Sequence, residues 1–311
     1  MADLQAIYQE FGTSGLIPYA LTPGSKGRQL LIDKIKEGAS LYYLESVFGT
    51  PFIRVYDGAY HMVAYTEEQE AEAAREAAQQ DRYETVVRAL PAEDREEAVK
   101  RLFSSGPEAI RIDDALSIPL KQLAEVPTYD GRPTTDFILL NRDLNGAVFY
   151  YFQTAYAQKN NAAAERRWAE TMFQSEFLVA VEDDAANGYP FLTTTVNKTT
   201  CLYIFSDWDE VTKVFPGKAP ACIIAKFEEL DNVLDQFPGC KLLFNQGSCH
   251  FLMDPNMMLT IRTILNSANF THDEPIVTPQ VMKNNSTPAA ALSQVPEDDW
   301  DSADPTPDWL K

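Results

Sequence analysis

The chain has 311 residues, of which 45% are hydrophobic, and 46 acidic against 26 basic residues give a formal net charge of −20. Because a surface this acidic repels phosphate backbones, we expect no nucleic-acid partner. No apolar run approaches the roughly 20 residues that cross a bilayer, and the start of the chain lacks the basic and apolar regions of a signal peptide. We therefore expect a cytoplasmic protein with no membrane association, long enough for two domains.

The first half of the chain alternates extended and helical patterns. The turn Tyr56-Asp57-Gly58 separates two apolar runs and predicts a β-hairpin. Thr66 and Gln69 have the spacing of a capping box, which predicts a helix start. The expected elements, in chain order, are a strand at 16–21, a helix at 28–37, a hairpin at 51–65, a helix from 66, charged helical segments over 81–103, a strand and short helix over 109–125, and a strand, turn and strand over 136–156.

The second half shows the same kinds of element in clearer form. A helix within 158–174 follows an Asn-Ala stretch that reads as a linker. Ser206 and Asp209 again have capping-box spacing, and Asn197-Lys198 marks a hairpin bend. The expected elements are a strand at 177–181, a hairpin over 190–205, a helix at 207–215, a strand and helix over 219–237, a strand, turn and strand over 240–254, and a helix at 256–269.

The order of these elements suggests an internal repeat. In our alignment, 177–181 corresponds to 16–20, the hairpin at 190–206 to that at 51–66, and Asn245 to Asn141. The surplus residues of the first copy are then insertions, chiefly the charged segment 81–103. Two unrelated α+β halves remain the alternative.

The last residues, 273–311, differ in composition from the rest of the chain. They hold eight acidic and two basic residues and are rich in Pro, Ser and Thr, so we expect a disordered acidic tail. Trp300 and Trp309 stand among these acids. We interpret them as candidate binding residues that dock on a protein partner, with packing against the protein's own body as the alternative.

Residues 175–262 resemble the SseB amino-terminal domain. The resemblance rests on the strand FLVAVE, on the strand that runs into a capped helix in CLYIFSDWDEVTKVF, and on the strand end LLFNQG. The Asn-Pro-Gly type of turn usual in that family is replaced here by Asn245-Gln246-Gly247. The first half resembles a more divergent copy. The resemblance implies a cytoplasmic bacterial α+β domain, and it implies no catalytic residues.

No motif in the sequence indicates a defined chemistry. Cys249 and His250 are neighbours on an expected strand, so their side chains point to opposite faces and cannot form a nucleophilic pair. Cys240 with these two lacks a fourth zinc ligand, and Asp113-Asp114 resembles a helix cap. Phosphate-binding and dinucleotide-binding glycine motifs are absent. We expect no catalytic residues, no metal and no cofactor.

We therefore predict two tandem SseB-like α+β domains, each a mixed or antiparallel sheet covered by helices. The expected divisions are 1–157 for the first domain, 158–174 for a linker or helix, 175–272 for the second domain and 273–311 for the tail. The predicted function is that of a non-catalytic binding or regulatory protein with a protein partner. A small-molecule enzyme with a site between the domains is the alternative, and self-association into a homo-oligomer through a sheet edge is a third.

Overall fold

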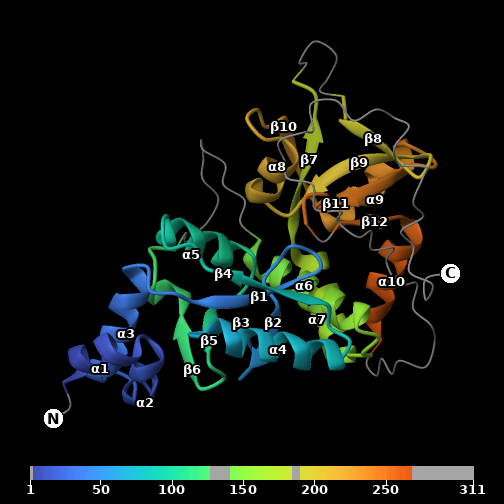
Figure 1. Cartoon of the computed structure of the whole chain (residues 1–311). Helices are drawn as coiled ribbons and strands as arrows, with labels where there is room; N and C mark the ends of the chain where they lie inside the picture. The colour runs from blue at the N-terminus through green and yellow to red at the C-terminus, as the bar shows by residue number, and fades with distance from the viewer. Residues whose placement is uncertain (1–2, 127–140, 184–189, 249, 268–311) are drawn as a thin grey trace. The chain divides into compact units, whose positions relative to one another are not determined.

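The computed structural model describes residues 3–126, 141–183, 190–248 and 250–267 (Figure 1). Contacts divide the chain into two units, Met1–Thr128 with Tyr156–Lys159, and Tyr129–Ala155 with Asn160–Lys311. Each unit contains a separate six-stranded mixed sheet with helices packed against it. The expected α+β fold with two sheet-and-helix domains is confirmed.

The sheet of the first unit has the order β4-β1-β3-β5-β6, and β2 pairs with the early part of β3. Only β3 and β5 run parallel among these pairs. The strands are β1 Tyr42–Ser46, β2 Ile53–Tyr56, β3 Ala59–Tyr65, β4 Thr85–Ala89, β5 Ala109–Ile112 and β6 Leu116–Pro119. The helices are α1 Leu4–Phe11, α2 Ile17–Ala20, α3 Lys26–Lys36, α4 Glu68–Gln80 and α5 Arg95–Ser104, with 3-10 turns η1 Ser14–Leu16 and η2 Leu120–Gln122.

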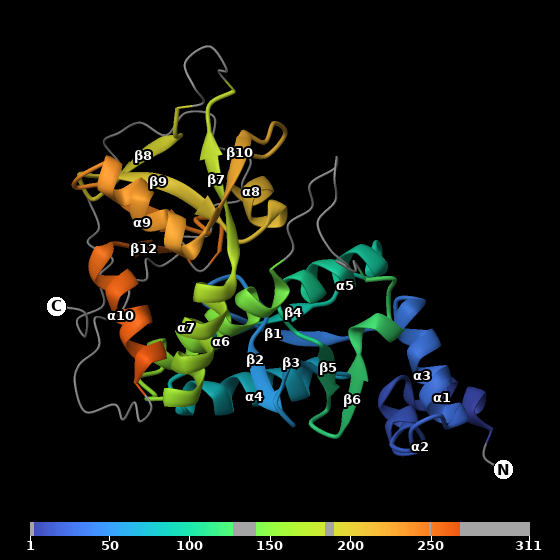
Figure 2. The same cartoon turned by 180° about the vertical axis from the view of Figure 1, so that it is seen from behind.

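Helices cover the two faces of this sheet unequally. Among the helices described in this unit, α4 packs on one face, where Ala71 contacts a core that includes Leu44, Phe52 and Val63. The opposite face carries the larger core, to which α2, α3 and α5 contribute buried side chains. Figure 2 shows α4 and α5 on opposite sides of this sheet. Helix α4 covers only the part of this face nearest β1. The uncovered part carries the polar side chains that are described below.

The second unit repeats this sheet. Its order is β10-β7-β9-β11-β12, β8 pairs with the early part of β9, and β9 and β11 are the parallel pair. The strands are β7 Glu176–Val181, β8 Thr193–Val196, β9 Thr199–Phe205, β10 Ala221–Lys226, β11 Lys241–Phe244 and β12 Phe251–Met253. The helices are α6 Arg142–Tyr156, α7 Ala162–Gln174, α8 Trp208–Val214, α9 Phe227–Gln236 and α10 Pro255–Asn266.

Aromatic side chains fill the core on one face of the second sheet. Phe152 of α6 stacks on Phe251 of β12 with ring centroids 4.8 Å apart, and Trp168 of α7 meets the edge of Phe152 at 6.4 Å. On the other face, α8 buries Val211 against Leu178 and neighbouring residues. Each buried aromatic side chain removes a large apolar area from water, so this layer contributes most of the driving force for packing α6 and α7.

The two sheets match residue by residue as well as strand by strand. Ala64 pairs with Ile112 in the first parallel pair, and Ile204 pairs with Phe244 in the second. In each pair the second residue, Ile112 or Phe244, is the last residue of its strand, β5 or β11. The connections also agree, since each parallel pair is joined by a helix, an edge strand and a second helix. The predicted repeat is confirmed in its strand order.

The alignment from sequence, however, was wrong in the first unit. Residues 16–21 were predicted to be a strand, but they form the end of η1 and helix α2, with Pro18 in the first turn where its missing N–H costs nothing. The first strand is instead β1. Likewise, the charged segment 81–103 is no insertion, because it contains β4 and α5, the counterparts of β10 and α9.

The prediction of a strand, turn and strand over 136–156 was also wrong where the structure describes it. Residues 142–156 form helix α6, whose aromatic and branched residues gave it the composition of a strand. The supposed equivalence of Asn141 and Asn245 fails with it, since Asn141 immediately precedes this helix. The true counterpart of Asn245 is Asp113, which follows β5 as Asn245 follows β11.

The acidic tail at 273–311, including Trp300 and Trp309, lies outside the described residues. Among the residues that are described, no helix is both long and apolar enough to span a bilayer.

Candidate functional site

A group of polar side chains lies on the α4 side of the first sheet, beyond the area that α4 covers. Arg54 of β2 pairs with His61 of β3, and Arg111 of β5 pairs with Val63. Since Val63 belongs to the core under α4, Arg111 and His61 share that face through the alternation of side chains along a strand. We call this group the Arg–Tyr cluster, and its members are Arg54, Tyr56, His61, Tyr65, Arg111, Asp114 and Ser117.

Three donors converge on the carboxylate of Asp114. The hydroxyl of Tyr56 donates to one oxygen at 3.3 Å, and the hydroxyl of Tyr65 donates to the other at 3.4 Å. One guanidinium nitrogen of Arg54 lies 3.9 Å from the first oxygen. Burial and the negative charge of Asp114 raise the pKa of Tyr65, so its phenol stays protonated and remains a donor.

Arg111 and Tyr56 hold each other in place beside this carboxylate. The Arg111 guanidinium lies 4.9 Å from the centre of the Tyr56 ring, within the range of a cation–π contact. It also donates to the backbone carbonyl of Asp114 at 2.6 Å and to the hydroxyl of Ser117 at 3.2 Å. His61 meets the Tyr56 ring edge to face at 5.3 Å. The aromatic ring is therefore fixed on both sides, by Arg111 and by His61.

The cluster is accessible in part. The side chain of Arg54 is 41% exposed and that of Asp114 is 53% exposed. His61, in contrast, is buried. The cluster thus presents a half-exposed cation and a half-exposed carboxylate above a buried polar and aromatic floor.

The second unit carries apolar residues at most of the same places in its sheet. Tyr56 corresponds to Val196, and Ser117 corresponds to Leu252, by the pairing of β2 with β3 and of β5 with β6. His61 and Arg111 likewise correspond to Cys201 and Leu243. In the second unit these counterparts form a small apolar cluster, made of Val196, Cys201, Leu243 and Leu252. The same sheet therefore folds with apolar side chains at the positions of Tyr56, His61, Arg111 and Ser117, whereas Arg54 and Asp114 have the polar counterparts Thr194 and Gln246.

The turn after β5 shapes the cluster. Asp113 and Asp114 both have left-handed backbone conformations, with φ of 49° and 52°. Asp113 points back toward the end of β3, where it accepts hydrogen bonds from the backbone N–H and the hydroxyl of Thr66, both at 2.8 Å. The prediction of a helix cap at Asp113-Asp114 was therefore wrong, because these residues form the β5–β6 turn.

The second unit has an equivalent side-chain connection between two strand ends, made there by buried residues. Asn245, at φ 43°, accepts from the backbone N–H of Ser206 at 2.9 Å and donates to the Ser206 hydroxyl at 2.9 Å. Both residues are fully buried. The end of β9 and the end of β11 are thus joined by a side chain, just as Asp113 joins the ends of β3 and β5.

A buried carboxylate extends this network. Asp207 accepts from the amide of Asn145 at 2.6 Å, from the hydroxyl of Ser206 at 3.0 Å and from the backbone N–H of Glu210 at 3.0 Å. Burial, and then the charge of Glu210, raise the pKa of Asp207 to about 6. Ser248 donates to Glu210 at 2.7 Å. Every partner here belongs to the protein, and the side chains are enclosed, so we interpret this network as structural.

Helix capping differs from the prediction by one residue in both units. Asp207, rather than Ser206, caps α8 through its bond to Glu210. In the first unit Glu67 stands at the cap of α4 and makes no side-chain capping bond. The predicted capping boxes at Thr66 and Ser206 were wrong because both hydroxyls are engaged by the turn after the parallel strand.

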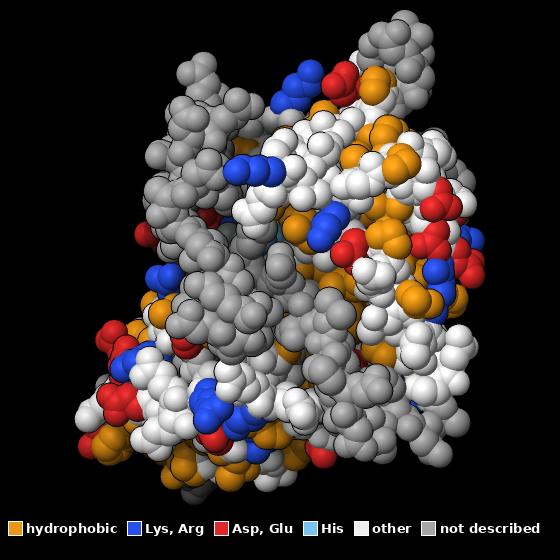
Figure 3. All heavy atoms as spheres, turned by 90° about the vertical axis from the view of Figure 1, so that its right-hand side faces the viewer, with side chains coloured by type: hydrophobic (Ala, Val, Ile, Leu, Met, Phe, Trp, Pro, Cys, Tyr) orange, Lys and Arg blue, Asp and Glu red, His pale blue; other side chains and the backbone are white. Residues whose placement is uncertain are grey.

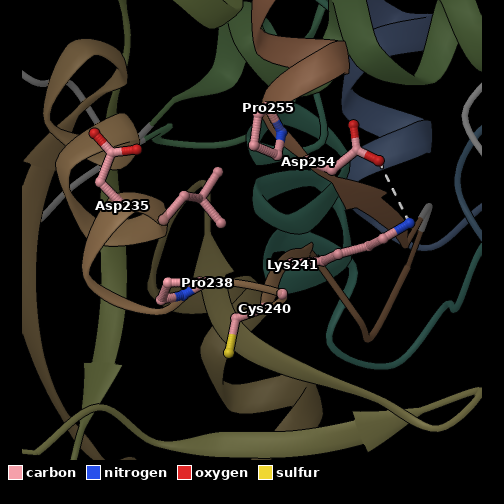
Figure 4. Close-up of a pocket in the computed structure, with 8 residues that line it drawn as sticks. Asp235, Pro238, Cys240, Lys241, Asp254 and Pro255 are labelled. Carbon is pink, nitrogen blue, oxygen red and sulfur yellow. Dashed lines mark ion pairs between the residues drawn. The ribbon is translucent and has the colours of Figure 1, made fainter.

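A pocket of about 330 Å³ lies between the end of α9 and the start of α10 (Figure 4). Lys241 extends toward Asp254, 3.4 Å away, and the sulfur of Cys240 lies on the side away from that ion pair. The pocket is lined by Leu234, Asp235, Pro238, Gly239, Cys240, Lys241, Asp254 and Pro255. Its charged groups are already paired or point away, so it offers no group poised for chemistry.

The remaining candidates from the sequence do not assemble. Cys249 lies outside the described residues, His250 is buried, and burial lowers its pKa. Burial raises the pKa of Cys201 and of Cys222 to about 11, which keeps these thiols protonated. Within the described ranges, no three His, Cys, Asp or Glu side chains are grouped to hold a metal.

The face drawn in Figure 3 shows Lys and Arg side chains interspersed with Asp and Glu side chains. No extended patch of one sign is visible among the described side chains on that face. The strongly acidic net charge is thus not collected into a single patch on this face.

Sequence reasoning missed the Arg–Tyr cluster. The alternation of polar and apolar residues in Ile53-Arg54-Val55-Tyr56 places Arg54 and Tyr56 on one face of a strand, and that signal was readable. Their meeting with Arg111 and Asp114 depends on the pairing of β3 with β5, some fifty residues apart, which no local pattern specifies.

No family model matches the chain. No curated protein matches it either. Among solved structures, Anabaena Tic22, described as a protein-transport protein, is similar to the chain at 14% sequence identity and a TM-score of 0.17. The match covers 75% of this chain and 96% of that one. A similarity at this level carries no argument about what this chain does.

Proposed function

We propose that the protein is a non-catalytic binding or regulatory protein and that the Arg–Tyr cluster is its binding surface. The observation that supports this proposal is the contrast between the two copies of the sheet. The second copy fills four of the equivalent positions with Val196, Cys201, Leu243 and Leu252, so this fold does not need polar side chains at those four positions. Arginine and tyrosine, on the other hand, are enriched at the residues that dominate binding energy in protein interfaces.

Chemistry at the cluster is not favoured. Acid–base catalysis needs a titratable group held where it can reach a substrate, and His61 is buried against the Tyr56 ring. The exposed groups are a guanidinium and a carboxylate that lie 3.9 Å apart. A guanidinium stays protonated at any physiological pH and serves in recognition rather than proton transfer.

The SseB assignment and a bacterial cytoplasmic location form part of this proposal. The resemblance of 175–262 to the SseB amino-terminal domain, together with the repeated sheet order of the two units, supports two tandem copies of that domain. The ligand of the cluster is then a protein partner, and self-association remains an outcome that the experiment below can reveal.

The proposal predicts that the protein still folds, but no longer binds its partner, when cluster residues are replaced by their counterparts from the second unit. Arg54→Thr with Tyr56→Val introduces the side chains found at Thr194 and Val196. We expect the variant to keep its circular dichroism spectrum and to lose the partner that the wild-type protein captures from native cells. Quantitative mass spectrometry of crosslinked complexes measures that loss.

Arg88→Thr provides the matched control. Arg88 lies on β4 of the same sheet, has a side chain 55% exposed and pairs with Glu45 at 3.1 Å. The Arg88→Thr substitution removes one arginine from the sheet and leaves the cluster unchanged. We therefore expect this variant to capture the same partner as the wild type. Equal capture by the double variant and by this control would refute the assignment of the binding surface.

A further inference from the structure

We propose that the Arg–Tyr cluster is a receptor for an oxyanion group, a carboxylate or a phosphate, and that Asp114 occupies this receptor as an internal substitute in the unbound protein. This inference rests on the proposed function and adds the chemical class of the ligand. It follows from the direction in which the donors of the cluster point.

All three donors around Asp114 are suited to an oxyanion. Two phenol hydroxyls donate, one to each carboxylate oxygen, and the Arg54 guanidinium approaches one of the same oxygens. Arginine presents a planar set of N–H groups that matches both carboxylate and phosphate. An external oxyanion placed where the Asp114 carboxylate lies would meet the same three donors.

The backbone of Asp114 is held more tightly than its carboxylate. Its carbonyl accepts from Arg111 at 2.6 Å, whereas its carboxylate is half exposed, accepts from the two phenols at 3.3 and 3.4 Å and lies 3.9 Å from Arg54, beyond hydrogen-bond length. An ion pair this exposed is weak. A ligand that replaces the two long phenol bonds with its own oxygens can therefore displace the carboxylate while the turn and Arg111 remain in place.

The rest of the cluster gives the receptor a rigid base. The Tyr56 ring is fixed by Arg111 and His61, and the Arg54 guanidinium also lies 5.8 Å from the centre of the Phe52 ring. Donors that are already positioned lose little freedom when a ligand binds. In the second copy, Arg54, Tyr56 and Asp114 correspond to Thr194, Val196 and Gln246, so that copy has neither the cation nor the internal carboxylate.

The test uses the full-length protein labelled with ¹⁵N and follows the Arg54 side-chain Nε–H signal and the backbone amides of Tyr56 and Asp114. Acetate, inorganic phosphate and a hexaglutamate peptide are titrated at constant ionic strength. We expect saturable shifts at these signals in the wild type. The relative strength of the phosphate and hexaglutamate titrations then indicates whether the natural group is a phosphate or a peptide carboxylate.

Two substitutions are expected to act in opposite directions. Arg54→Thr removes the cation and is expected to weaken binding by roughly tenfold or more, whereas Arg88→Thr stays within about twofold of the wild type. Asp114→Asn removes the competing charge while keeping a residue that tolerates the left-handed turn, and it is expected to tighten binding by roughly three- to tenfold.

Either of two results would overturn the inference. The first is that Asp114→Asn binds the oxyanions no more tightly than the wild type does. The second is that Arg54→Thr binds them as tightly as the control Arg88→Thr does. These results are separable from the test of function. If the cluster variant loses its cellular partner but no oxyanion binds, the binding surface stands and the ligand class is wrong.

Discussion

Replacing Asn245 with alanine is expected to lower the free energy of unfolding of the second unit by about 4 kcal/mol. The substitution removes both side-chain hydrogen bonds to Ser206 and leaves the Ser206 N–H buried without its acceptor. It also places alanine at φ 43°, where a side chain other than Asn, Asp or Gly is strained. These three costs act together because one residue makes both bonds from a left-handed conformation.

Urea denaturation followed by tryptophan fluorescence measures this effect. Trp168 and Trp208 lie in the second unit, and no tryptophan lies in residues 1–128. Trp300 and Trp309 are replaced by phenylalanine in the parent and in every variant, so that the signal comes from the second unit. Asn197→Ala is the matched control. Asn197 has φ 48° but sits exposed in the β8–β9 turn, so its replacement carries the conformational cost alone, about 1 kcal/mol.

If the two variants lose the same stability, then the side-chain tie between β9 and β11 contributes nothing and its structural role is disproved. Asp113→Ala in the first unit removes the equivalent bonds to Thr66. We expect a smaller effect there, because Asp113 is less enclosed than Asn245 and water can replace part of what is lost.

The second large effect is a pH dependence that originates at Asp207. Burial and the charge of Glu210 raise its pKa from 3.8 to about 6. An acid with a raised pKa binds its proton more tightly in the folded state, so below about pH 4 both states are protonated and stability is unaffected. Between about pH 4 and pH 6 the unfolded chain loses its proton first, and the folded state becomes less stable as the pH rises.

The size of this fall is set by the difference between the two pKa values, which corresponds to about 3 kcal/mol. Asp207→Asn removes the titrating group. We therefore expect the variant to gain about 3 kcal/mol relative to the wild type between pH 4 and pH 7, measured as the change in their difference by urea denaturation. The substitution also alters the hydrogen bonds of residue 207, which lowers the stability of the variant by the same amount at every pH. This constant offset does not affect the change of the difference with pH.

Other buried groups titrate in the same range and cancel in the comparison. Burial raises the pKa of Glu165 to about 7, which acts in the same direction as Asp207, and burial lowers the pKa of His250, which acts in the opposite direction. Both are present in the wild type and in the variant. Asp235→Asn, at an exposed carboxylate of α9 that does not act on Asp207, is the control and should keep the wild-type pH profile. A difference between Asp207→Asn and wild type that does not change with pH would contradict the assignment.

Several elements could be read directly from the sequence. The hairpin bends at Asp57-Gly58 and Asn197-Lys198 were predicted and lie in left-handed conformations, which the residue types of such turns favour. In the second half, the strands and helices from β7 to α10 follow the expected order. Local pattern was sufficient there because each strand is short, apolar in most of its residues or rich in threonine, and bounded by turn residues.

The failures in the first half share one physical cause. Residues 85–89, Thr-Val-Val-Arg-Ala, lie among charged helical neighbours that hide their strand propensity, and they form β4 because all five pair with β1. Residues 142–156 have the composition of strands, yet they form α6, with Leu144, Val148 and Phe152 buried. Tertiary contacts override local propensity when pairing or burial is worth more than the roughly 1 kcal/mol per residue that propensity supplies.

The sequence by itself determined the class of the protein, the repeat of one sheet-and-helix unit and the positions of its clearest turns, because periodicity and turn chemistry are local properties of the chain. Only the tertiary structure decided which residues are equivalent in the two copies and which side chains meet. Asp113 rather than Asn141 is the counterpart of Asn245, and Arg54, Tyr56 and Asp114 come together through the pairing of strands far apart in sequence. Such contacts depend on register across a sheet, and register is fixed by the burial of whole faces rather than by neighbouring residues.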